Sequence, residues 1–240
     1  MKISRKLNHS IWFKLLLFIP LFMLLWIIML QYETICNFGG TLRTAVSLKT
    51  FIDALIPFNI YISYTYILCL FYVPFAGILY AFNRRISAIQ MISFYISGIC
   101  IYLVTYAIYL ILPTTAQGVM INSFNPQILN YWMFQALQGI YTASTPLGDF
   151  PSLHVAPLVF MGIFLYKYWR WFFWMFLPFA FFGAIGTVLL KFHTFAGLLG
   201  GIAMWYFGYY IIYEKIFLIC FKKIFLSKEE SIAEEKQITP

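Results

Sequence analysis

Two short stretches decide how the chain is organised: residues 148–154, Gly-Asp-Phe-Pro-Ser-Leu-His, and residues 191–193, Lys-Phe-His. Each ends in a histidine at the beginning of a long apolar segment, and these histidines, His154 and His193, are 39 residues apart. A helix rises about 1.5 Å per residue, so this chain length spans roughly 58 Å, or about two crossings of a hydrocarbon core ~30 Å thick. The spacing therefore predicts that both imidazoles lie at the same membrane face.

The composition is that of a membrane protein. Of the 240 residues, 62% are hydrophobic and only 10% are charged, whereas a soluble domain has about 25% charged residues. Aromatic residues make up 22%, which suits the belts that form at membrane–water interfaces. We interpret the net charge of +8 as basic cytoplasmic ends, and we predict no nucleic-acid partner. The four cysteines lack paired-ligand spacing, so the sequence predicts neither a metal site nor a disulfide.

Six apolar segments predict an all-α fold, a six-helix transmembrane bundle formed by residues 1–225. A short amphipathic segment precedes the second span, and a long connection at 113–152 is interpreted as functional, with a possible interfacial helix at 131–141. Residues 226–240 form a charged tail that is predicted to be disordered and cytoplasmic. The predicted spans are 11–32, 60–82, 91–112, 152 to about 167–170, 171–190 and 193–213, and the amphipathic segment is 51–58.

An even number of spans places both termini on one side of the membrane, and the basic residues indicate which side. Thirteen Lys and Arg residues fall near the termini and in the turns after the second and fourth spans. Only Arg43, Lys49 and Lys191 fall on the opposite face. Because cytoplasmic segments are enriched in Lys and Arg, both termini are predicted to be cytoplasmic, with His154 and His193 facing outward.

The two histidine segments also suggest an anion site. Ser152 is placed to cap the fourth span, with His154 in its first turn, and Thr194 is placed to cap the sixth span beside His193. Helix amino-terminal amides and the helix dipole favour a bound anion. Lys191 adds a positive charge at the same membrane face, which would favour a bound anion. An equally good interpretation is that its side chain extends to the membrane–water interface, as those of lysines at helix ends often do.

Four segments resemble a known family. Residues 150–156, Phe-Pro-Ser-Leu-His-Val-Ala, resemble the second signature of the type-2 phosphatidic acid phosphatase superfamily. Residues 186–193, Gly-Thr-Val-Leu-Leu-Lys-Phe-His, with the glycines that follow at 197, 200 and 201, resemble its third signature. Residues 52–58 and 112–114 are similar to segments of the branch that contains inositol phosphorylceramide synthases. The resemblance extends over about residues 50–205.

The resemblance implies a role for each matched residue. His193 would attack phosphorus and become phosphohistidine, while His154 would protonate the leaving group. Ser152 would help to hold the phosphate, and Lys191 and Thr187 stand where further phosphate contacts are expected. A water molecule or another hydroxyl would then attack the phosphoenzyme. The resemblance implies no metal and no cofactor.

The chain departs from the family pattern at three places. The basic first signature is not evident near Pro113, and Thr187 stands where many members have a phosphate-binding Arg. Gly197 stands where the family has the Asp that orients the nucleophilic histidine. Asp149 is the best-placed surrogate for this carboxylate, although a Pro-Leu-Gly-Asp turn also explains its presence. The three glycines after His193 are interpreted as sites of close helix packing.

These features favour a membrane lipid phosphatase or phosphotransferase that acts on a phospholipid or another lipid phosphate at the level of the headgroups of the bilayer. The alternative is a catalytically impaired relative that binds or translocates a phospholipid, because Gly197 replaces the family Asp. A channel or transporter has less support, since no predicted helix carries a charge near its middle. The sequence leaves open the lipid, the acceptor, the choice between hydrolysis and transfer, and the oligomeric state.

Overall fold

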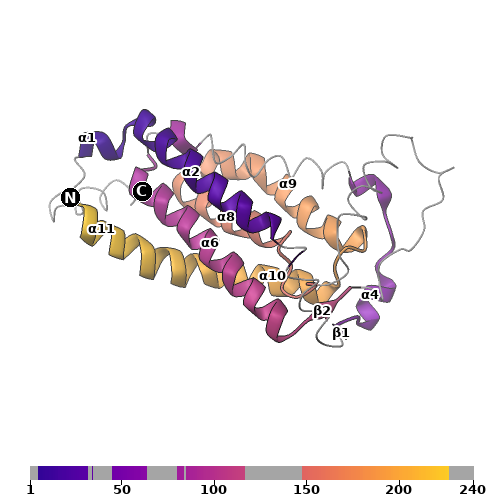
Figure 1. The fold of residues 1–240 in the computed structure, drawn as a ribbon. Helices are drawn as coiled ribbons and strands as arrows, with labels where there is room; N and C mark the ends of the chain where they lie inside the picture. Colours follow the sequence, from indigo (N-terminus) through magenta and orange to yellow (C-terminus); the bar gives the residue numbers. More distant parts are fainter. Residues whose placement is uncertain are drawn as a thin grey trace.

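The protein is mostly helical. The computed structural model describes residues 5–31, 34, 45–63, 80–83, 85–116 and 148–226, and its elements run side by side along one long axis (Figure 1). In chain order these are α1 (Arg5–Asn8), α2 (Ile11–Leu30), β1 (Val46–Ser47), α4 (Phe51–Leu55), the 3-10 turn η1 (Ile60–Ile62), α6 (Ala88–Ile111), β2 (Thr114–Thr115), α8 (Ala156–Tyr168), α9 (Arg170–Leu189), α10 (Phe195–Phe207), the π-helix η3 (Gly208–Leu218) and α11 (Ile219–Phe225).

Among the described residues, four helices are long and apolar enough to cross a membrane, as expected of an integral membrane protein. They are Ile11–Ile28 within α2, then α6, α9, and the continuous helix Phe195–Phe225 that α10, η3 and α11 form together. The 24 residues of α6 span about 36 Å, which exceeds the ~30 Å of a hydrocarbon core. Their apolar side chains are compatible with the hydrocarbon core of a bilayer. Within each helix the backbone N–H and C=O groups hydrogen-bond to one another, so they need no water.

The predicted first, third, fifth and sixth spans are confirmed as helices, and the last of them is longer than expected, because it continues to Phe225. The fourth is shorter: α8 has 13 residues, about 20 Å, and begins at Ala156 rather than at Ser152. Pro157 explains the late start, since its ring nitrogen cannot donate to a carbonyl in the preceding turn. Most of the predicted second span, the possible helix at 131–141 and residues 227–240 of the tail lie outside the described residues.

Helix α6 packs against α2 and η3, while α8 packs between α9 and α10. Aromatic side chains fill the interior. Phe94 of α6 stacks on Phe160 of α8 with ring centroids 4.6 Å apart, and Tyr102 of α6 meets Trp205 of α10 edge-on at 5.5 Å. Each such ring pair stabilises the fold by about 0.5–1.5 kcal/mol more than the burial of its surface does. Because this gain depends on ring geometry, it favours one packing arrangement.

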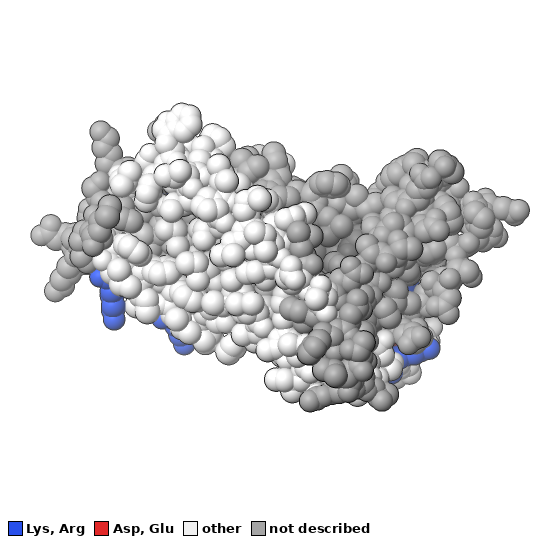
Figure 2. Space-filling model, viewed as in Figure 1, with Lys and Arg blue, Asp and Glu red and all other residues white. Residues whose placement is uncertain are grey.

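The two ends of the bundle differ. At the right-hand end of Figure 1, α4, the parallel pair β1–β2, the end of α9 and the beginning of α10 come together. The opposite end holds α1 and α11, and the described basic side chains gather toward it. Among the atoms that are not grey in Figure 2, Lys or Arg atoms are visible only toward the two ends of the molecule, and no Asp or Glu atoms are visible. Lys14, Arg85, Lys167, Arg170, Lys215, Lys222 and Lys223 lie toward the α1–α11 end, and Lys49 and Lys191 lie at the other.

Candidate active site

His193 lies in a short loop whose shape is set by the end of α9. The amide of Lys191 donates to the carbonyl of Val188 at 3.1 Å, and the amide of Phe192 donates to the carbonyl of Thr187 at 2.9 Å. These two bonds make the Schellman arrangement that closes a helix carboxyl terminus. Lys191 takes the left-handed position with a φ of 60°, which costs a non-glycine residue about 1 kcal/mol. The chain then turns sharply, so His193 emerges beside the beginning of α10.

Thr194 caps α10, as the sequence predicts. Its hydroxyl oxygen accepts a hydrogen bond from the amide of Gly197 at 3.1 Å and donates its own proton to Oδ2 of Asp149 at 2.5 Å. The Thr194 amide also donates to Oδ1 of Asp149 at 2.8 Å. Hydrogen bonds to a charged group contribute about 1.5–3 kcal/mol each, so Thr194 fixes both oxygens of this carboxylate.

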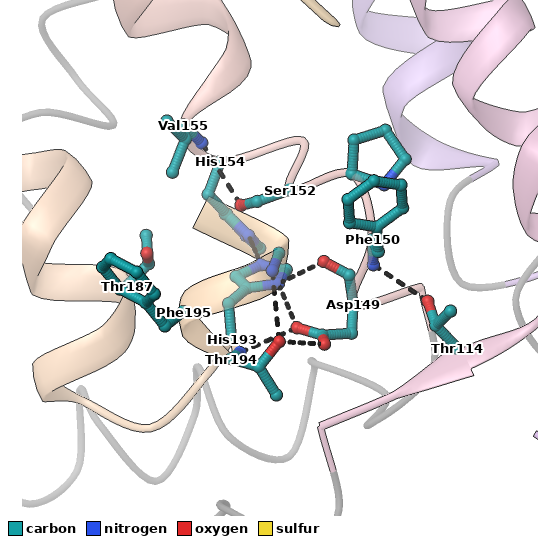
Figure 3. Close-up of polar contacts among 12 residues, drawn as sticks. Thr114, Asp149, Phe150, Ser152, His154, Val155, Thr187, His193, Thr194 and Phe195 are labelled. Carbon is teal, nitrogen blue, oxygen red and sulfur yellow. Dashed lines mark hydrogen bonds and ion pairs between the residues drawn. The ribbon is translucent and has the colours of Figure 1, made fainter. Parts of the chain in front are cut away.

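Asp149 in turn contacts the imidazole of His193 (Figure 3). Nδ1 of His193 lies 3.1 Å from the backbone oxygen of Asp149 and 3.3 Å from its Oδ1. Both partners can only accept, so Nδ1 carries the proton and Nε2 of a neutral ring keeps its lone pair. Burial by itself raises the pKa of Asp149, but the hydrogen bond and charge of His193 and the two bonds from Thr194 outweigh burial and lower it. The carboxylate is therefore ionised.

The second histidine lies on the other side of His193. Nδ1 of His154 is 2.7 Å from Nε2 of His193, and the rings are tilted by 58° with centroids 5.0 Å apart. Since Nε2 of His193 is the acceptor, Nδ1 of His154 donates. Burial, followed by the charge of His193, lowers the pKa of His154 to about 3. The structure thus aligns a carboxylate and two imidazoles, Asp149–His193–His154, and the His154 ring is neutral near pH 7.

The turn that carries Asp149 is held by groups that the sequence analysis missed. Thr114 of β2 binds it twice: its carbonyl accepts from the Gly148 amide at 2.9 Å, and its hydroxyl accepts from the Phe150 amide at 2.9 Å. The Tyr109 hydroxyl donates to the carbonyl of Pro151 at 2.6 Å. The similarity of residues 112–114 to a family segment was the only sequence signal that pointed to this region.

Gly197 is a glycine because Asp149 fills the adjacent space. A Cβ at position 197 would lie 2.4 Å from the backbone oxygen of Asp149 and 2.7 Å from its Oδ1. Similar contacts occur one turn on, where a Cβ at Gly200 would lie 2.3 Å from the Phe150 ring and one at Gly201 would lie 2.7 Å from the Ser152 carbonyl. The interpretation of these glycines as close-packing sites is therefore confirmed. An aspartate cannot enter at position 197 without displacing Asp149.

The predicted phosphate-binding residues lie near the histidines, but their polar groups have protein partners. Ser152 is buried, and its hydroxyl oxygen accepts from the Val155 amide at 3.4 Å, so it caps a turn before α8 and not α8 itself. The Thr187 hydroxyl donates to the Ala184 carbonyl at 2.8 Å. The Lys191 ammonium donates to the carbonyls of Asp53 at 2.8 Å and Ile56 at 2.6 Å. A role in binding phosphate stays a prediction for all three.

The amino terminus of α10 already holds anions of the protein itself. Oδ1 of Asp149 accepts from the Thr194 amide, and Oδ1 of Asp53 accepts from the Phe195 amide at 2.6 Å. We expected a phosphate there, but these carboxylates occupy amides that such a ligand would need and neutralise the positive end of the helix dipole. A phosphate at this helix end would have to compete with both carboxylates.

Within the described residues, no group of three or more His, Cys, Asp and Glu side chains is arranged to hold a metal ion. The ionisable groups that the structure brings together here are the carboxylate of Asp149 and the imidazoles of His193 and His154. Comparison of the chain with protein-family models, with curated proteins and with solved structures finds no match.

Proposed function

We propose that the protein is a membrane lipid phosphatase or phosphotransferase that acts through a phosphohistidine at His193, as members of the type-2 phosphatidic acid phosphatase superfamily do. The observation that carries this proposal is the line Asp149–His193–His154. In this arrangement the ionised Asp149 carboxylate holds Nδ1 of the His193 ring. Nε2, on the opposite side of the ring, carries the lone pair and faces the imidazole of His154.

The first step is attack by His193 on phosphorus. The phosphoryl group enters between the two rings, which must separate from their 2.7 Å contact. Nε2 of His193 forms a bond to phosphorus while the bond from phosphorus to the leaving oxygen breaks, and His154 transfers a proton to that oxygen. Positive charge develops on the His193 ring, and Asp149 stabilises it as the carboxylate of a triad does.

His154 needs a proton before it can act as the acid. Its pKa of about 3 keeps it neutral in the unliganded site. A phosphate anion placed next to the imidazole favours the charged form and raises this pKa. Substrate therefore binds together with a proton, taken from water or carried by the phosphate itself, whose second pKa is about 6 in a phosphomonoester.

The second step regenerates the enzyme. The now neutral His154 accepts a proton from water or from the hydroxyl of an acceptor lipid, whose oxygen attacks phosphorus. The bond from phosphorus to Nε2 of His193 breaks, and the ring returns to its neutral form. His154 then releases the proton that it accepted as the phosphate product leaves the site. Water gives hydrolysis, and an alcohol gives transfer of the phosphoryl or phosphodiester group.

We further propose that the chain crosses the bilayer six times, with both termini in the cytoplasm and the site at the outer face. The arrangement of basic side chains supports this orientation, since seven described Lys and Arg residues lie toward the α1–α11 end and two lie near the site. The site lies where spans end, at the level of lipid headgroups, which favours a lipid phosphate as substrate.

The test is to trap the intermediate. Purified protein is mixed with phosphatidic acid labelled in its phosphate, or with a labelled phosphodiester lipid, and is quenched in base, in which phosphohistidine survives. We expect an acid-labile adduct that His193→Ala abolishes and that forms more slowly in His154→Asn. His9→Ala, which changes the third histidine at the far end of the molecule, is the matched control and should leave the adduct unchanged.

An adduct that survives His193→Ala contradicts this assignment. If wild-type protein forms no adduct and releases no phosphate with either lipid, the proposed activity is wrong. Movement of a fluorescent phospholipid across vesicles that contain this inactive protein would then support the alternative, a relative that translocates lipid.

A further inference from the structure

We propose that α4 is a positioning element for His193, and that Asp53 and Lys191 are the residues through which it acts. This inference rests on the proposed function for the chemistry of His193, while the contacts that carry it are independent of that chemistry. Neither residue touches the histidine ring in any hydrogen bond of the described structure; each fixes the backbone on one side of it.

Asp53 is a buried carboxylate that joins α4 to α10. Its Oδ2 accepts from the amide and the hydroxyl of Thr50 at 2.7 and 2.9 Å, which fixes the side chain at the beginning of α4. Its Oδ1 accepts from the amide of Phe195 at 2.6 Å. The residue is 2% exposed, so this bond is shielded from water and stronger than a surface contact. Asp53 therefore fixes the chain two residues after His193.

Lys191 makes the reciprocal connection two residues before His193. Its ammonium donates to the carbonyls of Asp53 and Ile56, at the end of α4, at 2.8 and 2.6 Å. Lysines near a helix carboxyl terminus stabilise its unpaired carbonyls in this way. The left-handed position that Lys191 occupies strongly favours glycine. A lysine there indicates that its side chain has a function that glycine would lack, and its contacts with α4 supply that function.

Together these contacts enclose the His193 loop. The segment after α4 adds a third one, since the amide of Asn59 donates to the carbonyl of Leu189 at 3.1 Å. One short stretch of chain thus binds positions 189, 191 and 195, on both sides of a histidine that is itself only 3% exposed. Asp149 orients the imidazole ring, whereas α4 fixes the backbone from which the ring projects. A displacement of about 1 Å at a reacting group can cost about 100-fold in rate.

The test compares two variants that loosen the loop in different ways. Asp53→Ala removes the contact with Phe195, while Lys191→Gly removes the contacts with α4 and also relieves the backbone at φ 60°. Relief of the backbone therefore offsets part of what the two lost hydrogen bonds contribute to folding. Leu55→Ala, on the same helix with a side chain 74% exposed, is the matched control. Asp53→Asn keeps an acceptor for the Phe195 amide and should restore much of what Asp53→Ala loses.

Two readouts separate this inference from the proposed function. The first is the rate of adduct formation and its substrate dependence, for which we expect a fall of about 10- to 100-fold in kcat with KM changed less than about threefold. The second needs no substrate: the rate at which diethyl pyrocarbonate modifies His193, measured by mass spectrometry of its peptide. The buried ring should react several-fold faster in Asp53→Ala and Lys191→Gly than in Leu55→Ala.

The outcomes are distinct. Unchanged modification of His193 in both variants overturns the inference, whether or not wild-type protein forms an adduct. Faster modification with wild-type kcat means that α4 shields His193 but does not position it, which also overturns the inference. A rise in KM alone in Lys191→Gly shows that Lys191 binds substrate instead. A missing adduct in wild type, with faster modification in both variants, contradicts the proposed function and leaves the role of α4 in holding His193 supported.

Discussion

The backbone oxygen and the carboxylate of Asp149 both lie against Nδ1 of His193, at 3.1 and 3.3 Å, although 44 residues separate them in the chain. The same carboxylate binds the amide and hydroxyl of Thr194. Asp149 therefore links the turn before α8 to the beginning of α10, and it occupies the space that an aspartate at position 197 would need.

Asp149→Asn should slow adduct formation by about 10² to 10⁴-fold. Loss of the orienting carboxylate in serine proteases costs about 10⁴-fold. The range extends down to a 10²-fold slowing because the Asp149 backbone oxygen, 3.1 Å from Nδ1, remains as an acceptor in the variant. Rapid-quench measurement of the labelled adduct gives the rate, with Glu214→Gln, which changes a carboxylate paired with Lys167 outside the site, as the control. An unaltered rate in Asp149→Asn would show that the carboxylate has no part in the reaction.

Gly197→Asp should lower both activity and thermal stability. Its Cβ would meet the Asp149 backbone oxygen at 2.4 Å, and this contact forces the turn and α10 apart, since backbone cannot rotate away as a flexible side chain can. Gly98→Ala is the matched control, because nothing lies within 4 Å of a Cβ there and alanine favours the helix. Melting in detergent, followed by circular dichroism, measures the effect. A gain of activity in Gly197→Asp would mean that Asp149 is not the orienting group.

Stability should decrease as the pH falls below about 6.5, and His154 should account for part of this decrease. The folded-state pKa of His154, about 3, lies below its ordinary value of 6.5. Between these values the unfolded chain binds a proton that the folded protein excludes, so acid favours unfolding. His154→Asn keeps a donor for His193 but cannot titrate. Melting curves between about pH 7 and 4.5 should be less pH-dependent in this variant than in His9→Asn, and parallel curves would contradict the lowered pKa.

Binding of inorganic phosphate should be accompanied by proton uptake. An anion between the rings raises the pKa of His154 from about 3, so the ring acquires a proton when the ligand binds. A neighbouring opposite charge raises a pKa by about 1–3 units, so titration calorimetry is done at about pH 5, in buffers of different ionisation enthalpy, and should give an uptake of roughly 0.1 to 0.9 proton. The number should fall toward zero in His154→Asn. Equal uptake in both proteins would show that another group receives the proton.

Cysteine labelling should find opposite ends of the bundle on opposite sides of the membrane. In a background without the native cysteines, Tyr61→Cys at the site end should react with an impermeant maleimide added outside intact cells. Arg85→Cys and Lys215→Cys should react only after permeabilisation. Both Tyr61 and Arg85 are exposed, so accessibility within the protein is matched for that pair. Labelling of Arg85→Cys from outside would reverse the proposed orientation.

The sequence by itself determined the features that depend on neighbouring residues. Apolar segments about 20 residues long predict membrane helices, and the described part of the chain contains four of them, because hydropathy is a property of the segment alone. The Thr194 cap could be predicted for the same reason, since capping is completed within three residues. Pro157 carried a signal for the late start of α8 that the sequence analysis did not use.

Only the tertiary structure decided how these parts meet. Asp149 was predicted as the best-placed surrogate for the family carboxylate, but its contact with His193 depends on how the turn before α8 packs against the glycines of α10. The same holds for Lys191, whose ammonium binds carbonyls more than 130 residues away in the chain. Such contacts depend on the relative placement of loops that local patterns leave undetermined, because each loop alone satisfies its turn and cap preferences in several orientations. The sequence thus predicted which groups gather at one end of the bundle, and packing decided which of them touch.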